Sequence, residues 1–403
     1  VICISCCYSF VGLQATLTAN TVWGALRGLE TFSHLIATHR MITLVNISDM
    51  PRFPYRGLMV DTARRFLPLS MLKQVVDSMS YAKLNVLHVH MTDDQSWPMH
   101  MNTFPELADK GAFSPNHTYS VADVEELVAF ARLRGVRVLV EIDMPGHSSI
   151  LALSKPEVLT YCPAVAPYGL GYCTLDPTRN TTWAYIEALF TELYNSSRVS
   201  DEFVFLGGDE VPTNCWGANA TVLQWLQEHN ISLDQMQAYF EQRLVSFVNT
   251  TLKKTPVVWQ EAFQRAANPV KALGANAVID VWQGLDVATI ASATSQGLRV
   301  MVSGCWYLDK LNSDTMWGRD WINYYNCNPT SFNGSDAQKE LVIGGHGAIW
   351  GEACDATNII PRVWPRLAAV AERLWSPLIS SSDIHEFAPR LHSHRCRLLS
   401  RNV

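Results

Sequence analysis

The sequence predicts a (β/α)8 barrel, and two observations carry that prediction. Short apolar segments of strand type alternate with amphipathic segments of helix type from residue 55 onward, which indicates a parallel sheet covered by helices. Eight such units fit within this length, and eight parallel strands close into a barrel. The pattern divides the chain into residues 1–53, an N-terminal region with a linking helix, and the barrel at 54–403.

Each predicted strand is an apolar run that ends in polar or aromatic residues. The strands lie at 57–61, 85–90, 136–142, 203–206, 256–259, 277–281, 299–303 and from 341 to 350. Between them, Pro68 opens one helix, and Ser120 with Asp123 forms a capping-box pattern for another. We also expect a helix over 22–37 with Thr21 as its N-cap, a long insertion over 312–336, and a last helix over 364–375.

Composition and net charge indicate which kinds of molecule the protein could bind. The chain has 403 residues, of which 48% are hydrophobic and 17% charged, enough for a large core. The net charge of −6, without a cluster of Lys and Arg, disfavours nucleic acid as a partner. The 13 Trp are compatible with plain core, but flat aromatic faces are also what a sugar-binding site needs.

Glycosylation sequons and cysteines favour the secretory pathway. Asn-X-Ser/Thr sequons occur at Asn46, Asn116, Asn180, Asn195, Asn219, Asn230, Asn249 and Asn333. The 10 Cys show no paired zinc-binding spacing, which favours structural disulfides over zinc. The apolar stretch 1–13 is too short to cross a bilayer and lacks a basic start, so we expect a fragment without a membrane span.

The stretch 202–210 is the strongest candidate for chemistry. A buried strand ends there in Gly207-Gly208, followed by Asp209 and Glu210. Neighbouring side chains on extended backbone point to different sides, so the two carboxylates cannot share one role. One could act on the reacting bond while the other orients a group beside it. A solvated acidic turn is the simpler interpretation, but the apolar strand and the glycines, which let a ligand approach closely, favour a site.

The other predicted strands end in side chains of compatible chemistry. In a parallel barrel all carboxyl ends face one mouth. Together these residues predict a pocket with aromatic walls, several carboxylates and one Arg, which fits a neutral polyol better than a phosphate. The residues are Arg64, Asp93, Asp94, His147, Asp209, Glu210, Trp259, Trp282, Tyr307, Asp309, Trp350 and Glu352.

Nine stretches in this order resemble the family 20 β-N-acetylhexosaminidases, particularly the lysosomal β-hexosaminidase subunits. They are Tyr55-Arg56-Gly57, Asp61-Thr62-Ala63-Arg64, His90-Met91-Thr92-Asp93-Asp94, Met144-Pro145-Gly146-His147, Gly207-Gly208-Asp209-Glu210, Val258-Trp259-Gln260-Glu261, Trp306-Tyr307-Leu308-Asp309, Trp350-Gly351-Glu352 and Ala371-Glu372-Arg373-Leu374-Trp375. The resemblance runs from about residue 23 to the C-terminus, and it implies that most of the family's small N-terminal α/β domain is missing.

The resemblance implies a substrate-assisted mechanism, in which the 2-acetamido oxygen of the sugar attacks its own anomeric carbon. Glu210 would protonate the leaving oxygen and later activate water. Asp209 would hold the acetamido N–H, and Tyr307 would hydrogen-bond the acetamido oxygen. The implied substrates are glycans ending in N-acetylhexosamine, with no cofactor and no metal, in a homo- or heterodimer that is lysosomal or extracellular.

The resemblance also assigns the walls of the pocket. Tryptophans would enclose the sugar, polar side chains would bind its hydroxyls, and His147 would support the site. The tryptophans are Trp259, Trp282 and Trp350, and the hydroxyl-binding residues are Arg64, Asp93 and Glu352. Asp309 should disfavour acidic sugars while Lys310 could attract them, and we expect neutral ones. Cys162 and Cys215 match a family disulfide, whereas the partners of Cys173, Cys305, Cys327, Cys354 and Cys396 stay unassigned.

Three residues depart from the family's pattern, and two other functions stay open. Arg65, Val89 and His346 stand where the family commonly has His, Trp and Glu, and we expect altered packing there. A metal-dependent barrel hydrolase is one alternative, because His88 and His90 have a metal-ligand spacing. A sugar-binding protein without turnover is the other, although it would be expected to lack Asp209, Glu210 or Tyr307.

Overall fold

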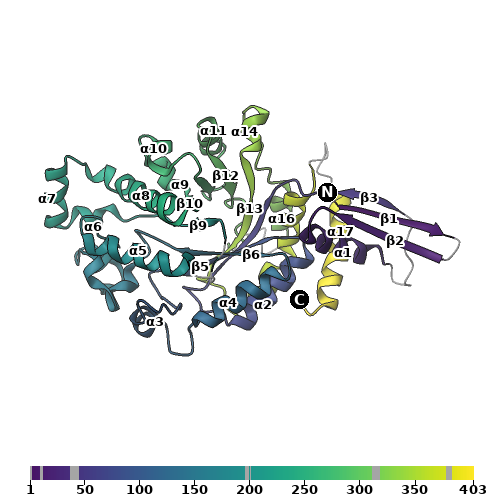
Figure 1. The fold of residues 1–403 in the computed structure, drawn as a ribbon, viewed down its shortest axis with the longest axis horizontal. Helices are drawn as coiled ribbons and strands as arrows, with labels where there is room; N and C mark the ends of the chain where they lie inside the picture. The colour runs from purple at the N-terminus through teal and green to yellow at the C-terminus, as the bar shows by residue number, and fades with distance from the viewer. Residues whose placement is uncertain are drawn as a thin grey trace.

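A computed structural model describes residues 2–9, 12–36, 45–195, 199, 201–310, 318–377 and 384–403. Parallel strands form a closed barrel in the order β10-β11-β12-β13-β4-β5-β6-β9, and helices surround it (Figure 1). The predicted (β/α)8 class is therefore confirmed. The barrel strands are β4 Tyr55–Asp61, β5 Val86–Thr92, β6 Arg137–Ile142, β9 Phe203–Phe205, β10 Thr255–Trp259, β11 Val278–Val281, β12 Arg299–Val302 and β13 Val342–Ile349.

Helices pack around the barrel, and most of those next to it share one core with the outer faces of the strands. They are α2 Leu69–Tyr81, α3 Glu106–Gly111, α4 Val121–Arg132, α5 Asn180–Asn195, α6 Thr213–Gly217, α7 Ala220–His229, α8 Met236–Phe247, α9 Gln260–Gln264, α10 Pro269–Leu273, α11 Val287–Ser295, α13 Asp320–Asn326, α14 Asp336–Glu340, α15 Ile359–Val363, α16 Arg366–Trp375 and α17 Ile384–Ser400. The capping box of Ser120 and Asp123 is present at α4, as predicted. The sequence did not predict α17, which carries Pro389 in its interior.

A second cluster of side chains fills the inside of the barrel. It includes Tyr55, Phe205, Trp259 and Met301, none more than 1% exposed. Because both faces of every strand are covered, the strands are buried nearly throughout, as expected of a parallel sheet. An antiparallel pair, β7 Leu159–Tyr161 and β8 Tyr172–Leu175, lies in the long connection between β6 and β9.

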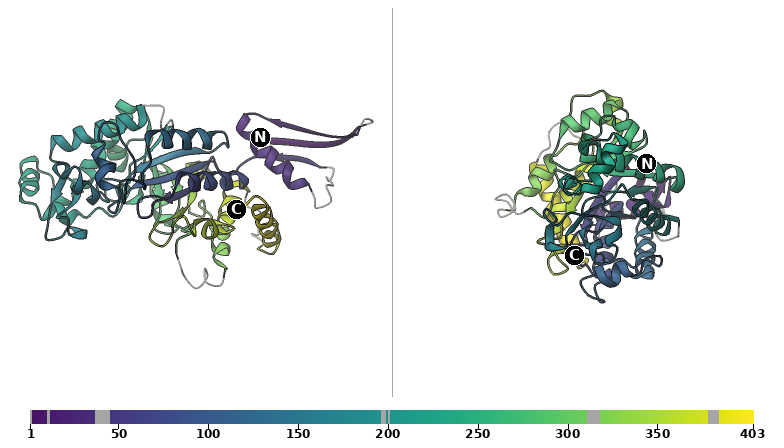
Figure 2. Two further views of the ribbon diagram at one scale, coloured as in Figure 1. Left: turned by 90° about the horizontal axis from the view of Figure 1, so that it is seen from below. Right: turned by 90° about the vertical axis from the view of Figure 1, so that its left-hand side faces the viewer.

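The first 53 residues contain three strands that the sequence analysis did not predict. The strands β1 Ile2–Ser9, β2 Gly12–Ala19 and β3 Asn46–Asp49 form an antiparallel sheet in the order β2-β1-β3, which projects from one end of the molecule (Figure 2). The predicted helix is present as α1 Val22–Leu35, and the Thr21 hydroxyl caps it by accepting from the Gly24 N–H at 3.0 Å. Its expected last residue, Ala37, lies outside the described residues.

Helix α1 is anchored to the amino-terminal side of the barrel. Arg27 is 5% exposed and donates to the carbonyls of Leu84 and Gly135, each at 2.8 Å, just before β5 and β6 begin. Burial lowers the pKa of Arg27 to about 10. Glu30 pairs with Arg401 at 2.8 Å, which ties α1 to the end of α17. The N-terminal region therefore covers the side of the barrel opposite the predicted mouth.

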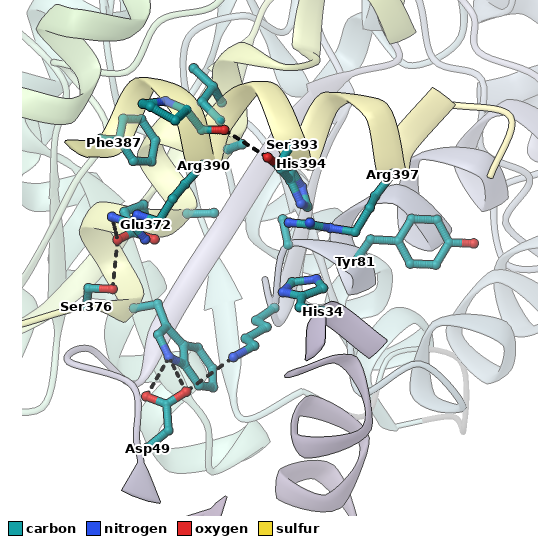
Figure 3. Close-up of a pocket in the computed structure, with 17 residues that line it drawn as sticks. His34, Asp49, Tyr81, Glu372, Ser376, Phe387, Arg390, Ser393, His394 and Arg397 are labelled. Atoms are coloured by element: carbon teal, nitrogen blue, oxygen red, sulfur yellow. Dashed lines mark hydrogen bonds and ion pairs between the residues drawn. The ribbon is translucent and has the colours of Figure 1, made fainter. Parts of the chain in front are cut away.

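A cavity of about 560 Å³ lies where α1, β3, α16 and α17 meet (Figure 3). Its charged side chains largely pair with each other: Asp49 with Lys83 at 3.2 Å, and Glu372 with Arg390 at 2.8 Å. Trp375 donates to Asp49 at 3.0 Å. These contacts join the N-terminal sheet to the barrel far from the carboxyl ends of the strands.

Two disulfides join described segments. Cys162 pairs with Cys215, as the resemblance implied, and Cys305 pairs with Cys327. In the part of the chain whose side chains are described, Cys173, Cys354 and Cys396 are free. None of the described helices combines the length and apolar character needed to cross a bilayer.

Candidate active site

A pocket of about 440 Å³ opens at the carboxyl ends of the barrel strands. Nine of its lining residues were predicted from the sequence as site residues, and Lys310 and Ala353 complete it. The lining residues are Arg64, His147, Asp209, Glu210, Trp282, Tyr307, Asp309, Lys310, Trp350, Glu352 and Ala353. The structure therefore brings together side chains from positions 64 to 352, as expected for strand ends of one barrel.

The turn after β9 requires both of its glycines. Gly207 and Gly208 have φ of +77° and +96°, where other residues are strained. A Cβ on Gly207 would lie 1.7 Å from Oδ1 of Asp143, so no side chain fits there. Glu210 also has a positive φ, +45°, a strained conformation of the kind found at active sites. This turn lets the next two side chains leave in different directions.

Asp209 and Glu210 have different surroundings, as their adjacency predicted. The Asp209 side chain is 10% exposed, whereas that of Glu210 is 61% exposed and faces the open pocket. Burial raises the pKa of Asp209, although the charge of His147 opposes this. The neighbouring Asp143 is fully buried, and burial together with the charge of Asp209 raises its pKa further still. Burial thus disfavours a second negative charge beside Asp209, and the stronger upward shift falls on Asp143.

His147 links the catalytic turn to a buried chain of ion pairs. Its Nε2 lies 3.7 Å from Oε2 of Glu210 and 3.9 Å from Oδ2 of Asp209. Its Nδ1 lies 3.1 Å from Oδ1 of Asp93. Although burial opposes it, the charges of Asp93 and Asp209 raise the pKa of His147 well above its usual range. A cationic imidazolium is thus held beside both carboxylates.

The chain continues from Asp93 into the barrel. Oδ2 of Asp93 accepts from Arg64 and from Nε2 of His90, each at 2.8 Å. On its other side His90 meets Glu141 at 2.9 Å. Against the effect of burial, His147 and His90 hold the pKa of Asp93 well below its usual range. Arg64, paired also with Asp61 at 3.1 Å, is the second cationic side chain, beside His147, that these ion pairs bring to the pocket.

The two histidines with metal-ligand spacing are engaged with Glu141. His88 Nε2 lies 2.7 Å and His90 Nδ1 2.9 Å from Oε2 of this carboxylate, and all three side chains are at most 1% exposed. They do not open to the pocket, so the geometry gives the metal-dependent alternative no substrate-accessible metal position at these histidines.

Aromatic rings form another part of the pocket lining. Trp282 donates from Nε1 to Glu261 at 2.8 Å and stacks on Tyr307 with ring centroids 6.3 Å apart. The centroid of the Trp350 ring also lies 6.4 Å from that of Tyr307. Burial raises the pKa of Tyr307 well above its usual range, so its hydroxyl stays a neutral donor. Lys310 Nζ lies 4.6 Å from the centre of the Tyr307 ring.

Two predicted contact residues lie beneath the pocket instead of on its surface. Asp93 and Trp259 are each 1% exposed, and neither lines the pocket. Both are occupied by buried partners: Trp259 donates from Nε1 to Glu141 at 2.8 Å, and Asp93 holds Arg64 and two histidines. Both side chains therefore support residues that line the pocket, and the expected contacts of Asp93 with a sugar hydroxyl and of Trp259 with the sugar stay predictions.

The departures from the family pattern flank or underlie the site. His346 is fully buried below the pocket, 3.5 Å from Oδ2 of Asp280, and burial with the charge of His88 holds its pKa well below the usual range. Arg65 donates to the Arg64 carbonyl at 2.9 Å, and Val89 is buried in the core. None of the three enters the pocket lining.

Sequence reasoning missed the carboxyls that hold the site from below. Glu141 ties two histidines and Trp259 together, and Asp143 accepts from the Gly208 N–H at 3.1 Å. The signal for Glu141 was present, because a charged residue inside the otherwise apolar run 138–142 indicates a buried ion pair. Glu241 on α8 gave no comparable signal, since it lies in an ordinary amphipathic helix.

A barrel whose mouth holds carboxylates beside aromatic rings is compatible with a glycoside hydrolase. The known proteins that this chain is similar to belong to the same class. The family model described as "Glycosyl hydrolase family 20, catalytic domain" matches residues 53–378. The chain is 40% identical over 396 residues to beta-hexosaminidase subunit beta of Mus musculus, covering 96% of the chain and 72% of that protein. It is 40% identical over 400 residues to beta-hexosaminidase subunit alpha of Rattus norvegicus, covering 97% and 74%.

Solved structures lead to the same family. A Flavobacterium johnsoniae chitobiase superposes with a TM-score of 0.85 at 27% identity, covering 99% of this chain and 59% of that one. A mutant Streptomyces plicatus beta-hexosaminidase in complex with the product GlcNAc gives 0.77 at 25% identity, covering 96% and 78%. The chain belongs to glycosyl hydrolase family 20, and it is a glycoside hydrolase of the β-hexosaminidase kind.

Proposed function

We propose that this enzyme removes terminal β-linked N-acetylglucosamine or N-acetylgalactosamine from glycans by substrate-assisted, retaining hydrolysis. The observation that carries the proposal is that the Asp209 and Glu210 side chains differ in their exposure to the pocket. In retaining enzymes with a protein nucleophile, two carboxyls face each other about 5–5.5 Å apart across the bond. Here the two carboxyls are neighbours on one turn, one buried and one open to the pocket. This arrangement supports the mechanism that the family resemblance implies, in which the substrate's own acetamido oxygen is the nucleophile.

Glu210 is the general acid and base of this scheme. It donates its proton to the glycosidic oxygen as the bond to the anomeric carbon breaks, while the acetamido oxygen forms a new bond to that carbon. The resulting ionised Glu210 then takes a proton from the water that opens the oxazolinium ring. Its exposed carboxyl can reach both the leaving group and the water, and the imidazolium of His147 lies 3.7 Å away.

Asp209 and Tyr307 orient the acetamido group. The negative charge of Asp209 accepts from the acetamido N–H and stabilises the positive charge that develops on the ring. The neutral Tyr307 hydroxyl donates to the acetamido oxygen and aims it at the anomeric carbon. Trp282 and Trp350 enclose the sugar, and Arg64 and Glu352 bind its hydroxyls. Asp93 and Trp259 hold these groups from beneath.

The preferred sugars are neutral. Asp309 and Lys310 both line the pocket, and burial with the charge of Glu352 raises the pKa of Asp309. An acidic group on the sugar would meet Lys310 but also the carboxyls of Asp309 and Glu352. The GlcNAc in the related Streptomyces plicatus complex is a neutral sugar of the proposed class.

We place the enzyme in the secretory pathway, in lysosomes or outside the cell, as a homo- or heterodimer. Sequons at Asn46, Asn116, Asn180, Asn230 and Asn333 are exposed, so a glycan could be attached at each. The two disulfides fit an oxidising compartment. The related mouse and rat proteins are named as subunits, which supports an oligomer.

The test is hydrolysis of a chromogenic β-GlcNAc substrate across pH, with Glu210→Gln and a thiazoline analogue of the oxazolinium ion. We expect Glu210→Gln to lower kcat/KM by about 10²–10⁴-fold and the analogue to block the parent enzyme. A folded parent that binds the analogue without turnover would point instead to a sugar-binding protein. Turnover that the analogue leaves untouched would contradict the substrate-assisted step.

A further inference from the structure

Helix α8 lies directly behind the turn that carries Asp209 and Glu210, and two of its polar side chains have no role in the proposed mechanism. Gln237 and Glu241 are one helical turn apart on the same face, and each is 1% exposed. Gln237 Nε2 donates to the carbonyl of Gly208 at 2.8 Å. Buried polar side chains at such a contact need a reason, because burying them without partners is costly.

The Glu241 carboxyl packs against Gly208 itself. A Cβ at Gly208 would lie 2.7 Å from Oε1 of Glu241, so the carboxyl fills the space that a side chain would need. The N–H of Gly208 donates to Oδ1 of Asp143 at 3.1 Å. Gly208 is thus held between Asp143 below the barrel mouth and the pair on α8.

The hydrogen-bond donors and acceptors of Gln237 and Glu241 match each other if the Glu241 carboxyl is protonated. Gln237 Oε1 and both Glu241 oxygens make no hydrogen bond within the described part of the chain. Because Gln237 turns its amide nitrogen to Gly208, its oxygen is left as an acceptor, which a carboxylate would repel and a carboxylic acid would satisfy. Burial and the charge of Asp209 raise the pKa of Glu241 well above its usual range, while Gln237 opposes the shift.

We propose that Gln237 and Glu241 are positioning residues, in which the Glu241 hydroxyl donates to Gln237 Oε1 and Gln237 Nε2 donates to the Gly208 carbonyl. This relay fixes the peptide that joins Gly208 to Asp209, and with it the direction of the Asp209 carboxylate. Neither side chain touches the substrate. The inference rests on the proposed role of Asp209, which needs its carboxylate aimed at the acetamido N–H.

Four variants test the relay: Glu241→Gln, Glu241→Met, Gln237→Met and the double Gln237→Met/Glu241→Met. Glu241→Gln keeps a donor, so kcat and the pH profile should match the parent. Glu241→Met fills the volume without a donor, and it should lower kcat about tenfold, the effect of losing one buried hydrogen bond, with KM nearly unchanged. Gln237→Met should do the same, and the double variant should be no worse than either single one, because the relay acts as a unit.

Leu244→Ala is the control for stability. Leu244 is fully buried on the same helix, so its truncation should lower Tm at least as much as Glu241→Met while leaving kcat at the parent value. A merely structural role for Glu241 would likewise appear in Tm and not in kcat.

Three outcomes would overturn the relay. They are a parental kcat in Glu241→Met, additive losses in the double variant, or an alkaline limb displaced to lower pH in Glu241→Gln, which would show that Glu241 is ionised in the parent. Failure of the proposed function looks different, because the parent itself would then hydrolyse β-GlcNAc without inhibition by the thiazoline analogue.

Discussion

The two walls of the pocket are built on different principles. The charged wall, from Arg64 to Glu210, is the visible end of a chain of buried ion pairs that runs through Asp93 and His90 to Glu141. The aromatic wall is held by stacking and by single N–H donations such as that of Trp282 to Glu261. Trp350 touches both walls, because its ring lies 5.0 Å from the Arg64 guanidinium, whereas Trp282 contacts Tyr307 and Glu261. A change in the charged wall should therefore propagate and affect the chemical step, whereas a change at Trp282 should be local and affect binding.

Among substitutions that compare the two walls without touching the proposed general acid, the largest effect is expected from Asp93→Asn. The substitution keeps the shape of the side chain but removes the charge that pairs with Arg64, His90 and His147, and with it one of the charges that raise the pKa of the imidazole beside Glu210. We expect kcat to fall about 10²-fold or more, with a smaller change in KM. Steady-state kinetics measure it, with the surface substitution Glu126→Gln as control. A change in KM alone would contradict the propagation along the charged wall.

Trp282→Ala should give the opposite pattern and a smaller effect. Removing the ring takes away a stacking surface for the sugar and for Tyr307, about 1.5 kcal/mol at most. We expect KM to rise about tenfold with kcat within a few-fold of the parent. Trp225→Ala, at a ring stacked on His229 outside the pocket, is the matched control. A loss confined to kcat would show that the aromatic wall also acts on the chemical step.

The charged wall should also make stability depend on pH. The folded-state pKa of His147 is raised above its unfolded value near 6.5, so its contribution is fully present below that pH and is lost as pH rises through the folded value. His147→Gln should therefore destabilise the protein more at pH 5 than at pH 9. Urea unfolding at both pH values measures the difference. An equal loss of unfolding free energy at the two would mean that His147 is neutral in the folded protein.

The smallest effect is expected at the edge of the aromatic wall. Lys310→Met should leave hydrolysis of neutral β-GlcNAc nearly unchanged, because the ammonium lies over the Tyr307 ring and its charge is not needed for a neutral sugar. Hydrolysis of a 6-sulfated β-GlcNAc substrate should fall several-fold, since the remaining carboxyls of Asp309 and Glu352 then repel the sulfate. The ratio of the two kcat/KM values is the readout, and an unchanged ratio would remove Lys310 from substrate selection.

The sequence predicted the parts of the molecule that follow from local pattern. Each barrel strand is a separate apolar run, and parallel strands bring their carboxyl ends to one mouth, so residues as distant as Arg64 and Glu352 could be placed together without a structure. How deeply each of these side chains is buried beneath the pocket could not be predicted in this way. Asp93 and Trp259 stand at strand ends like the others, yet buried partners on neighbouring strands draw them below the pocket.

The remaining features depend on contacts that sequence pattern does not encode. Glu241 supports the turn from a helix 31 positions further along the chain than Glu210, and only the packing of α8 against Gly208 reveals it. The strands β1 to β3 pair with one another, and β3 alternates between exposed and half-buried residues, so it lacks the fully buried run that identified the barrel strands. Helix α17 was not predicted because Pro389 interrupts the helical pattern of its sequence.

The most direct test of the central claim compares substrates whose 2-acetamido group carries none, one, two or three fluorine atoms. Fluorine withdraws electrons from the acetamido oxygen and weakens it as a nucleophile. If this oxygen attacks the anomeric carbon, log kcat/KM falls steadily along the series in the parent enzyme, and Asp209 and Tyr307 serve to aim it. A rate that does not change along the series would contradict the substrate-assisted mechanism and assign the nucleophile to the protein or to water.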